Sequence, residues 1–441
     1  MTKTRWFSRE RGEGSAFVLA LLSPCATLAF LALMAVFWAT QAQTCRGARP
    51  EASGAVTFNK DIAPIVFQHC AVCHHQGQVA PFALLTYKDV KSHAKQIGTV
   101  TGVRFMPPWK PEPGFGDFLG NRRLSDGDIN KFQQWIEEGA PEGDPHDLPP
   151  APSFSESWSL GKPDLVVELA RSFAVPADGP DIYRCFTLPL SVSEDKYIRA
   201  FEFLPGNRRV IHHAIVVEDR YGAARRLQGD SPDGYPCLGS FGFPVAGYLG
   251  MWTPGSIPKP WPEGVGKVAK KGSGLVTQVH FHPTGKPEST NFQIGLYFMP
   301  QPPRKVPFDI QAGTIDLDIP AGDRNYVVKS WTLVEQDVEA IGIIPHAHFL
   351  GKEVKATATL PDGTVKPLLW IRNWNFNWQE QYRYVTPVFL PQGTRVDLEW
   401  TYDNSDQNPA NPSHPPRRVR WGVEATDEMC ELHLEAVPAG K

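Results

Sequence analysis

The chain has 441 residues, of which 41% are hydrophobic and 21% are charged, and its formal net charge is -3. This length and composition provide enough apolar residues for two or three hydrophobic cores, so several domains are expected. A slightly acidic chain offers no basic face to nucleic acid or to an anionic membrane surface, and a nucleic-acid function finds no support.

Residues 1–45 have the pattern of a targeting segment. Three arginines among the first eleven residues precede an apolar run over 16–39, and Thr40-Gln41-Ala42 offers small residues to a signal peptidase. The apolar run is also long enough to remain as a membrane anchor. We therefore predict a signal peptide or anchor here, and export of the chain to the bacterial periplasm or to the periplasmic face of the membrane.

Residues 56–145 contain two predicted helices. Apolar residues at helical spacing run from Asp61 to Phe67, so a short helix should lead into Cys70. Further on, Ser125 and Asp128 form a start signal of the capping-box type, and apolar residues at helical spacing follow them. A second helix is therefore expected to begin there.

The segment Cys70-Ala71-Val72-Cys73-His74 has the spacing of covalent c-type haem attachment. The two thiols would reach the two vinyl groups of a haem, and the adjoining histidine would place its ring under the iron as an axial ligand. A redox dithiol or half of a zinc site is the alternative, but the chain has no second C-x-x-C. We predict one covalent c-type haem held by Cys70, Cys73 and His74.

A second axial ligand is then expected, and Met106 is the only methionine between residues 56 and 145. It lies in a loop that Pro107 and Pro108 stiffen, and such a loop could hold the thioether against the iron. The rivals are three histidines of the same region, His69, His75 and His93. We predict Met106 as the ligand.

With these motifs the segment over 56–145 resembles a small class I cytochrome c. The resemblance rests on the amphipathic helix before Cys70, the C-x-x-C-H motif, the Met106-Pro107 loop and a closing helix that contains Trp135-Ile136. It implies a small all-α domain that carries one electron at a time.

The pattern changes after a Pro-rich linker at residues 146–160. Short apolar runs such as Leu165-Val166-Val167-Glu168-Leu169 lie between Pro and Gly clusters, and no long helical period appears. A second Pro-rich junction follows Met299. We predict two all-β antiparallel sandwich domains, over 161–300 and 301–441, after the small all-α cytochrome c domain.

Six of the 13 histidines fall into three tight pairs, which are His212-His213, His280-Phe281-His282 and His346-Ala347-His348. Imidazole is the commonest neutral nitrogen ligand of copper and zinc, and i, i+2 spacing puts two rings on one face of a strand. Any one such histidine is more typical of an ordinary strand surface, but the clustering favours metal binding. The second Pro-rich junction separates the third pair from the others, so two metal sites are expected.

In the first β region, the adjacent His212 and His213 would point to opposite faces of an ideal strand. Joint ligation of one metal therefore requires a bulge or a strand end. His280 supplies a third nitrogen, and His282 is left as a ligand, a neighbour of a ligand, or neither.

In the second β region, His346 and His348 share one strand face, and Met429 is the natural soft third ligand. A His-His-Met set prefers copper, because a thioether stabilises Cu(I) while imidazoles hold both oxidation states. His414 and His433 are interpreted as ordinary residues.

Together these residues resemble the copper type II, ascorbate-dependent monooxygenases, the family of peptidylglycine hydroxylating monooxygenase and dopamine β-hydroxylase. The resemblance implies two jelly-roll-like domains whose separate coppers face a solvent cleft. In it, the electron-transfer copper is held by His212, His213 and His280, and the oxygen-binding copper by His346, His348 and Met429. The match rests, in family order, on His212-His213, Gln278-Val279-His280, the run from His346 to Gly351, and Asp427-Glu428-Met429-Cys430.

The implied reaction inserts one atom of O2 into a C–H bond of a small substrate and consumes two electrons. The Met429 site would be the catalytic one, and it must keep an open position for O2. The external donor would be ascorbate, a cytochrome or a quinol-linked donor, with the haem supplying or relaying the electrons. Two alternatives stay open: a non-catalytic haem and copper electron-transfer or copper-binding protein, and a copper oxidase.

The chain departs from the family at two positions that anchor the peptide in the amidating member. An Arg stands there two residues before the H-x-H motif and a Tyr four residues after the Met, whereas this chain has Ile344 and His433. A peptide ending in glycine is therefore not the expected substrate.

Two further groups of residues receive no site role. The aromatic residues between Trp370 and Tyr384 are interpreted as strand-packing residues. An exported chain permits disulfides, but sequence alone does not fix a pairing among Cys45, Cys185, Cys237 and Cys430.

Overall fold

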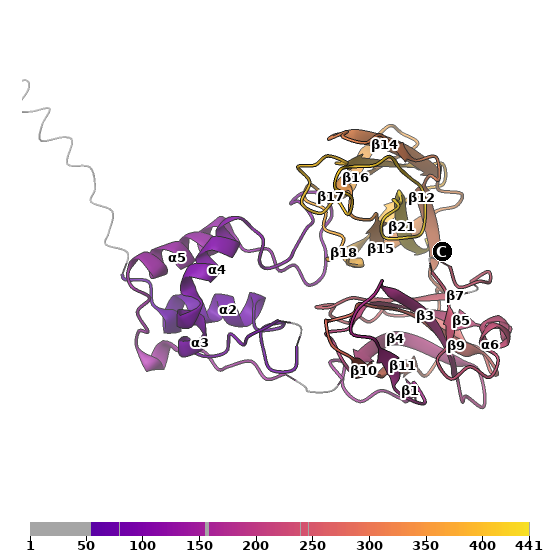
Figure 1. The fold of residues 1–441 in the computed structure, drawn as a ribbon, viewed down its shortest axis with the longest axis horizontal. Coiled ribbons are helices and arrows are strands. Elements are labelled where there is room, and N and C mark those ends of the chain that lie inside the picture. Colours follow the sequence, from indigo (N-terminus) through magenta and orange to yellow (C-terminus); the bar gives the residue numbers. More distant parts are fainter. Residues whose placement is uncertain (1–53, 79, 155–157, 239, 246, 441) are drawn as a thin grey trace, which may run out of the picture. The chain divides into compact units, whose positions relative to one another are not determined.

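The computed structural model describes residues 54–78, 80–154, 158–238, 240–245 and 247–440. Residues Val56–Lys441 form one compact unit, whose elements are labelled in Figure 1. The predicted targeting segment and Cys45 lie outside the described residues. Among the described residues, no helix combines the length and the apolar composition that a membrane span requires.

Short helices make up most of the regular structure before residue 148. Ser125 begins the longest of them with the capping box expected from the sequence: its hydroxyl accepts from the Asp128 N–H, and the Asp128 carboxylate accepts from the Ser125 N–H. Phe132 and Trp135 of that helix are fully buried. The helices are the π-helical turn η1 (Phe58–Ile62), α2 (Ala63–His69), α3 (Tyr87–Ser92), α4 (Ala94–Gly102), α5 (Asp126–Glu137) and the 3-10 turn η2 (Pro145–Asp147).

The predicted fold class is wrong, because the described chain is mostly β and has no separate all-α cytochrome c domain. Its residues form 21 strands but only five short α-helices. The segment between α4 and α5 is not helical, since Pro107, Pro108 and two further prolines interrupt it. Trp109 and Phe118 of this segment are buried in the core of the C-terminal strands, where Phe118 forms a β-bridge with Tyr384. The segment therefore packs as part of the β structure.

The first β-lobe comprises strands β1 to β11, and all of its strand pairs are antiparallel. A four-stranded and a five-stranded sheet enclose a core that includes Phe203, Phe281 and Phe292. The sheet orders are β1 (Leu165–Glu168), β11 (Phe292–Met299), β4 (Lys196–Pro205) and β8 (Lys267–Ala269); then β6 (Tyr235–Pro236), β3 (Ile182–Pro189), β9 (Gly274–Phe281), β5 (Ile211–Asp219) and β7 (Gly247–Trp252). A small sheet pairs β10 (Glu288–Thr290) with β2 (Phe173–Val175), and α6 spans Ala223–Gln228.

The second β-lobe comprises strands β12 to β21 and has the same two-sheet plan. Alternate residues of β19 are buried, as expected for a strand with one face on a core, and Trp400 is completely buried. The sheet orders are β12 (Phe308–Gly313), β21 (Glu431–Pro438), β15 (Val338–His346) and β18 (Tyr382–Leu390); then β14 (Tyr326–Leu333), β19 (Arg395–Tyr402), β16 (Gly351–Thr359) and β17 (Val365–Ile371). A small sheet pairs β13 (Asp318–Ile319) with β20 (Val419–Arg420).

A disulfide joins two of the cysteines that the sequence left unassigned. Cys185 of β3 is bonded to Cys237, 52 residues later, with a Cα–Cα distance of 5.7 Å. Both residues are buried, and the bond closes the long excursion that contains α6. Cys430 is a buried free thiol.

A buried ion pair holds the segment before α5 to the second lobe. The Arg122 Nη2 donates to the Glu380 Oε2 at 2.6 Å, and the two side chains are only 5% and 7% exposed. Lys259 lies 3.6 Å from the other Glu380 oxygen. A buried charge destabilises the fold unless an opposite charge lies beside it. Arg122 and Lys259 therefore both depend on Glu380.

We expect Glu380→Ala to lower the free energy of unfolding by about 3–5 kcal/mol, since it leaves Arg122 buried without its counter-charge. The paired change Arg122→Met with Glu380→Leu should cost less, because only Lys259 then loses its counter-charge. Urea unfolding followed by far-UV circular dichroism measures both. Equal losses in the single and paired variants would contradict this account.

Candidate metal and haem sites

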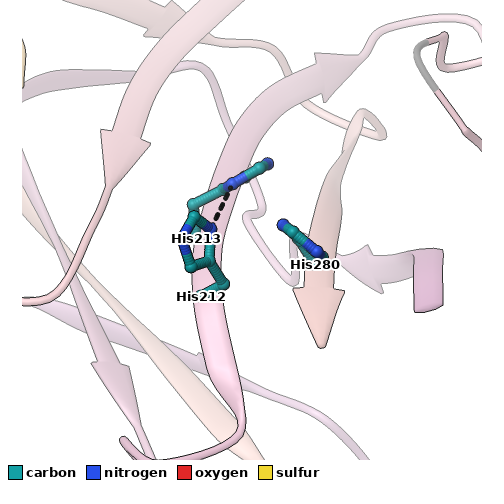
Figure 2. A group of neighbouring side chains, drawn as sticks. All are labelled: His212, His213 and His280. Atoms are coloured by element: carbon teal, nitrogen blue, oxygen red, sulfur yellow. Dashed lines mark hydrogen bonds between the residues drawn. The ribbon is translucent and has the colours of Figure 1, made fainter. Parts of the chain in front are cut away.

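A bulge in the first lobe brings three histidines together. In the pairing of β5 with β9, Ile211 lies opposite Phe281 and His213 lies opposite His280, so His212 is the extra residue of a register shift. This is the irregularity that joint ligation by adjacent histidines requires. Figure 2 shows the two rings on one strand, facing His280 on the next.

The three imidazoles have the geometry of a metal site. One nitrogen from each of His212, His213 and His280 lies within 4.8 Å of the others. The Nδ1 atoms of His212 and His213 are 3.3 Å apart (Figure 2). The Nδ1 of His280 is buried and has no hydrogen-bond partner among the described residues, whereas its Nε2 lies 2.6 Å from Asp181 Oδ2. A buried nitrogen without a partner is costly, and a metal ion would satisfy it.

Burial keeps the rings of His212 and His213 neutral. It lowers the pKa of His212 to about 4 and the pKa of His213 well below its ordinary value, and the neighbouring imidazoles lower both further. Only neutral imidazole offers a lone pair to a metal, so the cluster is prepared for ligation at neutral pH.

Asp181 is a residue of this site that the sequence analysis missed. Its two carboxylate oxygens accept from His280 and from His282 Nδ1, the latter at 2.7 Å. Burial alone would raise the pKa of Asp181, but the two histidine contacts lower it to about 2. The His282 side chain is 65% exposed and stands outside the cluster. Asp181 lies 99 residues before His280, so no local pattern points to it.

The second lobe brings His346, His348 and Met429 to one end of its sheet. His346 is the last residue of β15 and lies opposite Glu431, the first residue of β21. Both strands end at this pair, but the Glu428 carboxyl group accepts from the backbone N–H groups of His348 and of Met429, so the two backbones lie close together. The two imidazole centroids are 5.3 Å apart, and Met429 is 8% exposed. The segments that carry the two rings and Met429 therefore meet at one end of the sheet.

One nitrogen of each ring in this second site is bonded to protein. His346 Nδ1 lies 2.6 Å from Gln379 Oε1, and His348 Nδ1 lies 3.2 Å from the backbone oxygen of Asp427. The Nε2 atoms are therefore the ones left for a ligand. Burial lowers the pKa of both rings, that of His348 to about 3, so both are neutral.

Glu428 is a second residue that the sequence analysis did not assign. Its fully buried carboxylate accepts from the backbone N–H groups of His348, of Leu350 at 2.9 Å and of Met429 at 2.8 Å. Burial raises its pKa to about 8, although these N–H groups act in the opposite direction. The carboxylate thus ties the turn that carries His348 to the segment that carries Met429.

The C-x-x-C-H segment forms a tight turn after α2. The backbone N–H groups of Cys73 and His74 both donate to the Cys70 oxygen, at 3.1 and 3.0 Å, and both cysteines are free thiols. His74 Nδ1 lies 3.1 Å from the Phe82 oxygen, so its Nε2 is the nitrogen left for an iron. These residues fit a covalent haem: two thiols on one turn and a histidine of fixed tautomer.

The second axial ligand stays a prediction. Met106 is half-buried, and its backbone N–H donates to the Val100 oxygen at 3.1 Å. The ring of its rival His93 stacks on Phe82 at 3.8 Å, and Phe82 also lies 5.0 Å from the His74 ring. His75 stacks on Phe154 instead.

Comparison with known proteins assigns no family. No family model matches the chain, and no curated protein matches it. Among solved structures, the major capsid protein P2 of bacteriophage PM2 is 9% identical at a TM-score of 0.24, over 63% of this chain and 98% of that one. The PBCV-1 virus capsid is 7% identical at a TM-score of 0.21, over 63% and 95% of the two chains. Likeness at these scores assigns neither fold nor function.

His433 is placed by the structure in an ion-pair cluster. Its Nδ1 lies 2.6 Å from Asp309 and its Nε2 lies 3.4 Å from Glu431. Burial alone would lower its pKa, but the two carboxylates raise it to about 10. A raised pKa means that the charged ring stabilises the folded chain.

We expect His433→Gln to lower the free energy of unfolding by about 1–2 kcal/mol at pH 6, where the histidine contribution is fully present. This contribution should begin to fall above the ordinary pKa of 6.5 and disappear as the pH rises through about 10. Urea titrations of both proteins between pH 6 and pH 10 test this. A difference that grows with pH would show the sign to be wrong.

Proposed function

We propose that the chain is a copper-dependent monooxygenase that hydroxylates a C–H bond of a small substrate with O2, using electrons supplied or relayed by a c-type haem bound to the same chain. The observation that carries this proposal is the difference between the two histidine sites. The first brings three imidazole nitrogens within 4.8 Å of one another, whereas in the second the turn that carries His348 is tied by Glu428 to the segment that carries the thioether of Met429.

The first site suits an electron-transfer copper. His212, His213 and His280 each bring one nitrogen within 4.8 Å of the others, and two of the three rings are fixed by acceptors on their other nitrogen. Such fixed imidazoles suit both oxidation states of copper. In this proposal the three residues would hold a copper that passes electrons and does not contact the substrate.

The second site suits oxygen chemistry. His346 and His348 use Nδ1 to contact protein acceptors, and Met429, on the adjoining segment, carries a thioether, which is a soft, weak ligand that favours Cu(I). Three protein ligands leave a coordination position for O2, and copper bound there would supply the electron for its activation. Glu428 keeps the two halves of the ligand set together.

The substrate is proposed to be a small molecule. At the two positions where the amidating enzyme anchors its peptide, this chain has Ile344, a strand residue, and His433, which is engaged by Asp309 and Glu431. Neither offers a free group to a peptide carboxylate. The donor to the haem is proposed to be external, as ascorbate, a cytochrome or a quinol-linked protein.

We expect the purified chain to bind two copper ions, and His213→Ala and His348→Ala each to bind one. Reduction followed by heavy-isotope O2 should place one labelled oxygen atom in an organic product of a small-molecule panel. Copper counting by mass spectrometry and product analysis check both results. Label found only in water or peroxide would favour a copper oxidase, and two coppers without O2 consumption would favour a non-catalytic relay.

We expect Cys70→Ala with Cys73→Ala to abolish covalent haem, because both thiols form the attachment, while two coppers still bind. Copper reduction by a reduced small c-type cytochrome should become slower than in the wild-type chain. Pyridine haemochrome spectra and stopped-flow bleaching of the Cu(II) signal give the two readouts. Unchanged copper reduction would remove the haem from the electron route.

A further inference from the structure

One loop of the second lobe contacts both histidine sites. Residues 372–381, here the connecting loop, join β17 to β18. Asn377 Oδ1 lies 3.3 Å from His212 Nε2 in the first lobe. Two residues later, Gln379 Oε1 lies 2.6 Å from His346 Nδ1 in the second.

Each contact fixes the tautomer of the histidine ring, and therefore which nitrogen is free to bind a metal. An amide oxygen only accepts, so the proton of His212 must lie on Nε2 and its lone pair on Nδ1. By the same rule His346 carries its proton on Nδ1 and presents Nε2. The Gln379 Nε2 donates to the Phe376 oxygen at 3.0 Å, which fixes the orientation of its amide.

Phe376 lies between the two sites and is 6% exposed. Its ring is 5.8 Å from the His212 ring, nearly parallel at 24°, and 5.6 Å from the His348 ring. Phe349 packs on it at 4.4 Å. A ligand ring of each site therefore packs against the same aromatic side chain.

The loop is anchored on both sides of this ring. The Trp374 Nε1 donates to the backbone oxygen of His348 at 3.1 Å. The Thr253 hydroxyl of the first lobe donates to the backbone oxygen of Gln379 at 2.9 Å. A segment held at several points transmits a displacement at one of them to the others.

We propose that the connecting loop is a shared part of both metal sites: Asn377 and Gln379 are positioning residues for one imidazole each, and Phe376 fixes the two rings relative to one another. This rests on the proposed function only in taking the metal to be copper. The consequence is that a change at one site reaches the other through the loop, and such coupling is reciprocal.

The test measures copper affinity of the full chain after metal removal, by competing Cu(I) against a chromogenic chelator. His213→Ala isolates the second site and His348→Ala isolates the first. Gln379→Ala should weaken the second site, and Asn377→Ala the first, by about 10–100-fold. Gln379→Glu and Asn377→Asp keep the accepting oxygen and should restore most of the affinity, which a merely structural role would not predict.

Phe376→Ala should weaken Cu(I) binding at both isolated sites and alter the Cu(II) electron paramagnetic resonance spectrum of each. Gln392→Ala is the matched control, since this glutamine lies in the β18–β19 turn, and it should leave both affinities unchanged. Unchanged affinities in Asn377→Ala and Gln379→Ala, or an effect of Phe376→Ala at one site alone, would overturn the inference. A wild-type chain that fails to bind two coppers would instead overturn the proposed function.

Discussion

The candidate sites depend on one constraint, which is that a histidine offers a single chosen nitrogen to a metal only when its other nitrogen is held by protein. Five of the six candidate histidine ligands meet it. The held nitrogens of His74 and His348 face backbone oxygens, and those of His212, His280 and His346 face the side chains of Asn377, Asp181 and Gln379. These acceptors select Nδ1 in the first lobe and Nε2 in the second. His213 is aligned differently, by its position next to the bulge.

The ligands could be predicted from the sequence, but the acceptors could not. The i, i+2 spacing reveals His346 and His348, although β15 ends at His346, and the need for a bulge at His212 follows from strand geometry alone. The acceptors lie far away in the chain: Asp181 is 99 residues from His280, and Asn377 is 165 residues from His212. Asp181 immediately precedes β3 and Asn377 lies in the connecting loop, so only the tertiary fold brings them to the histidines. The aromatic residues of the connecting loop look like ordinary packing residues for the same reason, although Phe376 contacts a ring of each site.

The error in fold class has a comparable origin. The capping box at Ser125 and the short helix before Cys70 follow from local patterns and are present. The Pro-rich stretch between α4 and α5 has no local pattern of its own, because its prolines only exclude helix. Trp109 and Phe118 could pack against a helical domain or against a β core, and the local sequence does not distinguish the two. In the structure they are buried in the core of the second lobe. A cysteine motif therefore predicts attachment chemistry without fixing the domain around it.

Each site contains a buried polar group that destabilises the folded chain, and the two sites differ in the contacts that offset this loss. In the first, the buried His280 Nδ1 has no partner among the described residues, and an unsatisfied buried group of this kind costs about 1–3 kcal/mol. The bulge, the Tyr183 ring stacked on His280 at 4.2 Å and the Asp181 carboxylate hold this arrangement in place. In the second, the buried Glu428 carboxylate is the costly group, and three backbone N–H groups compensate for it. Because these groups are already in position, we expect a metal to bind with little rearrangement of the lobes.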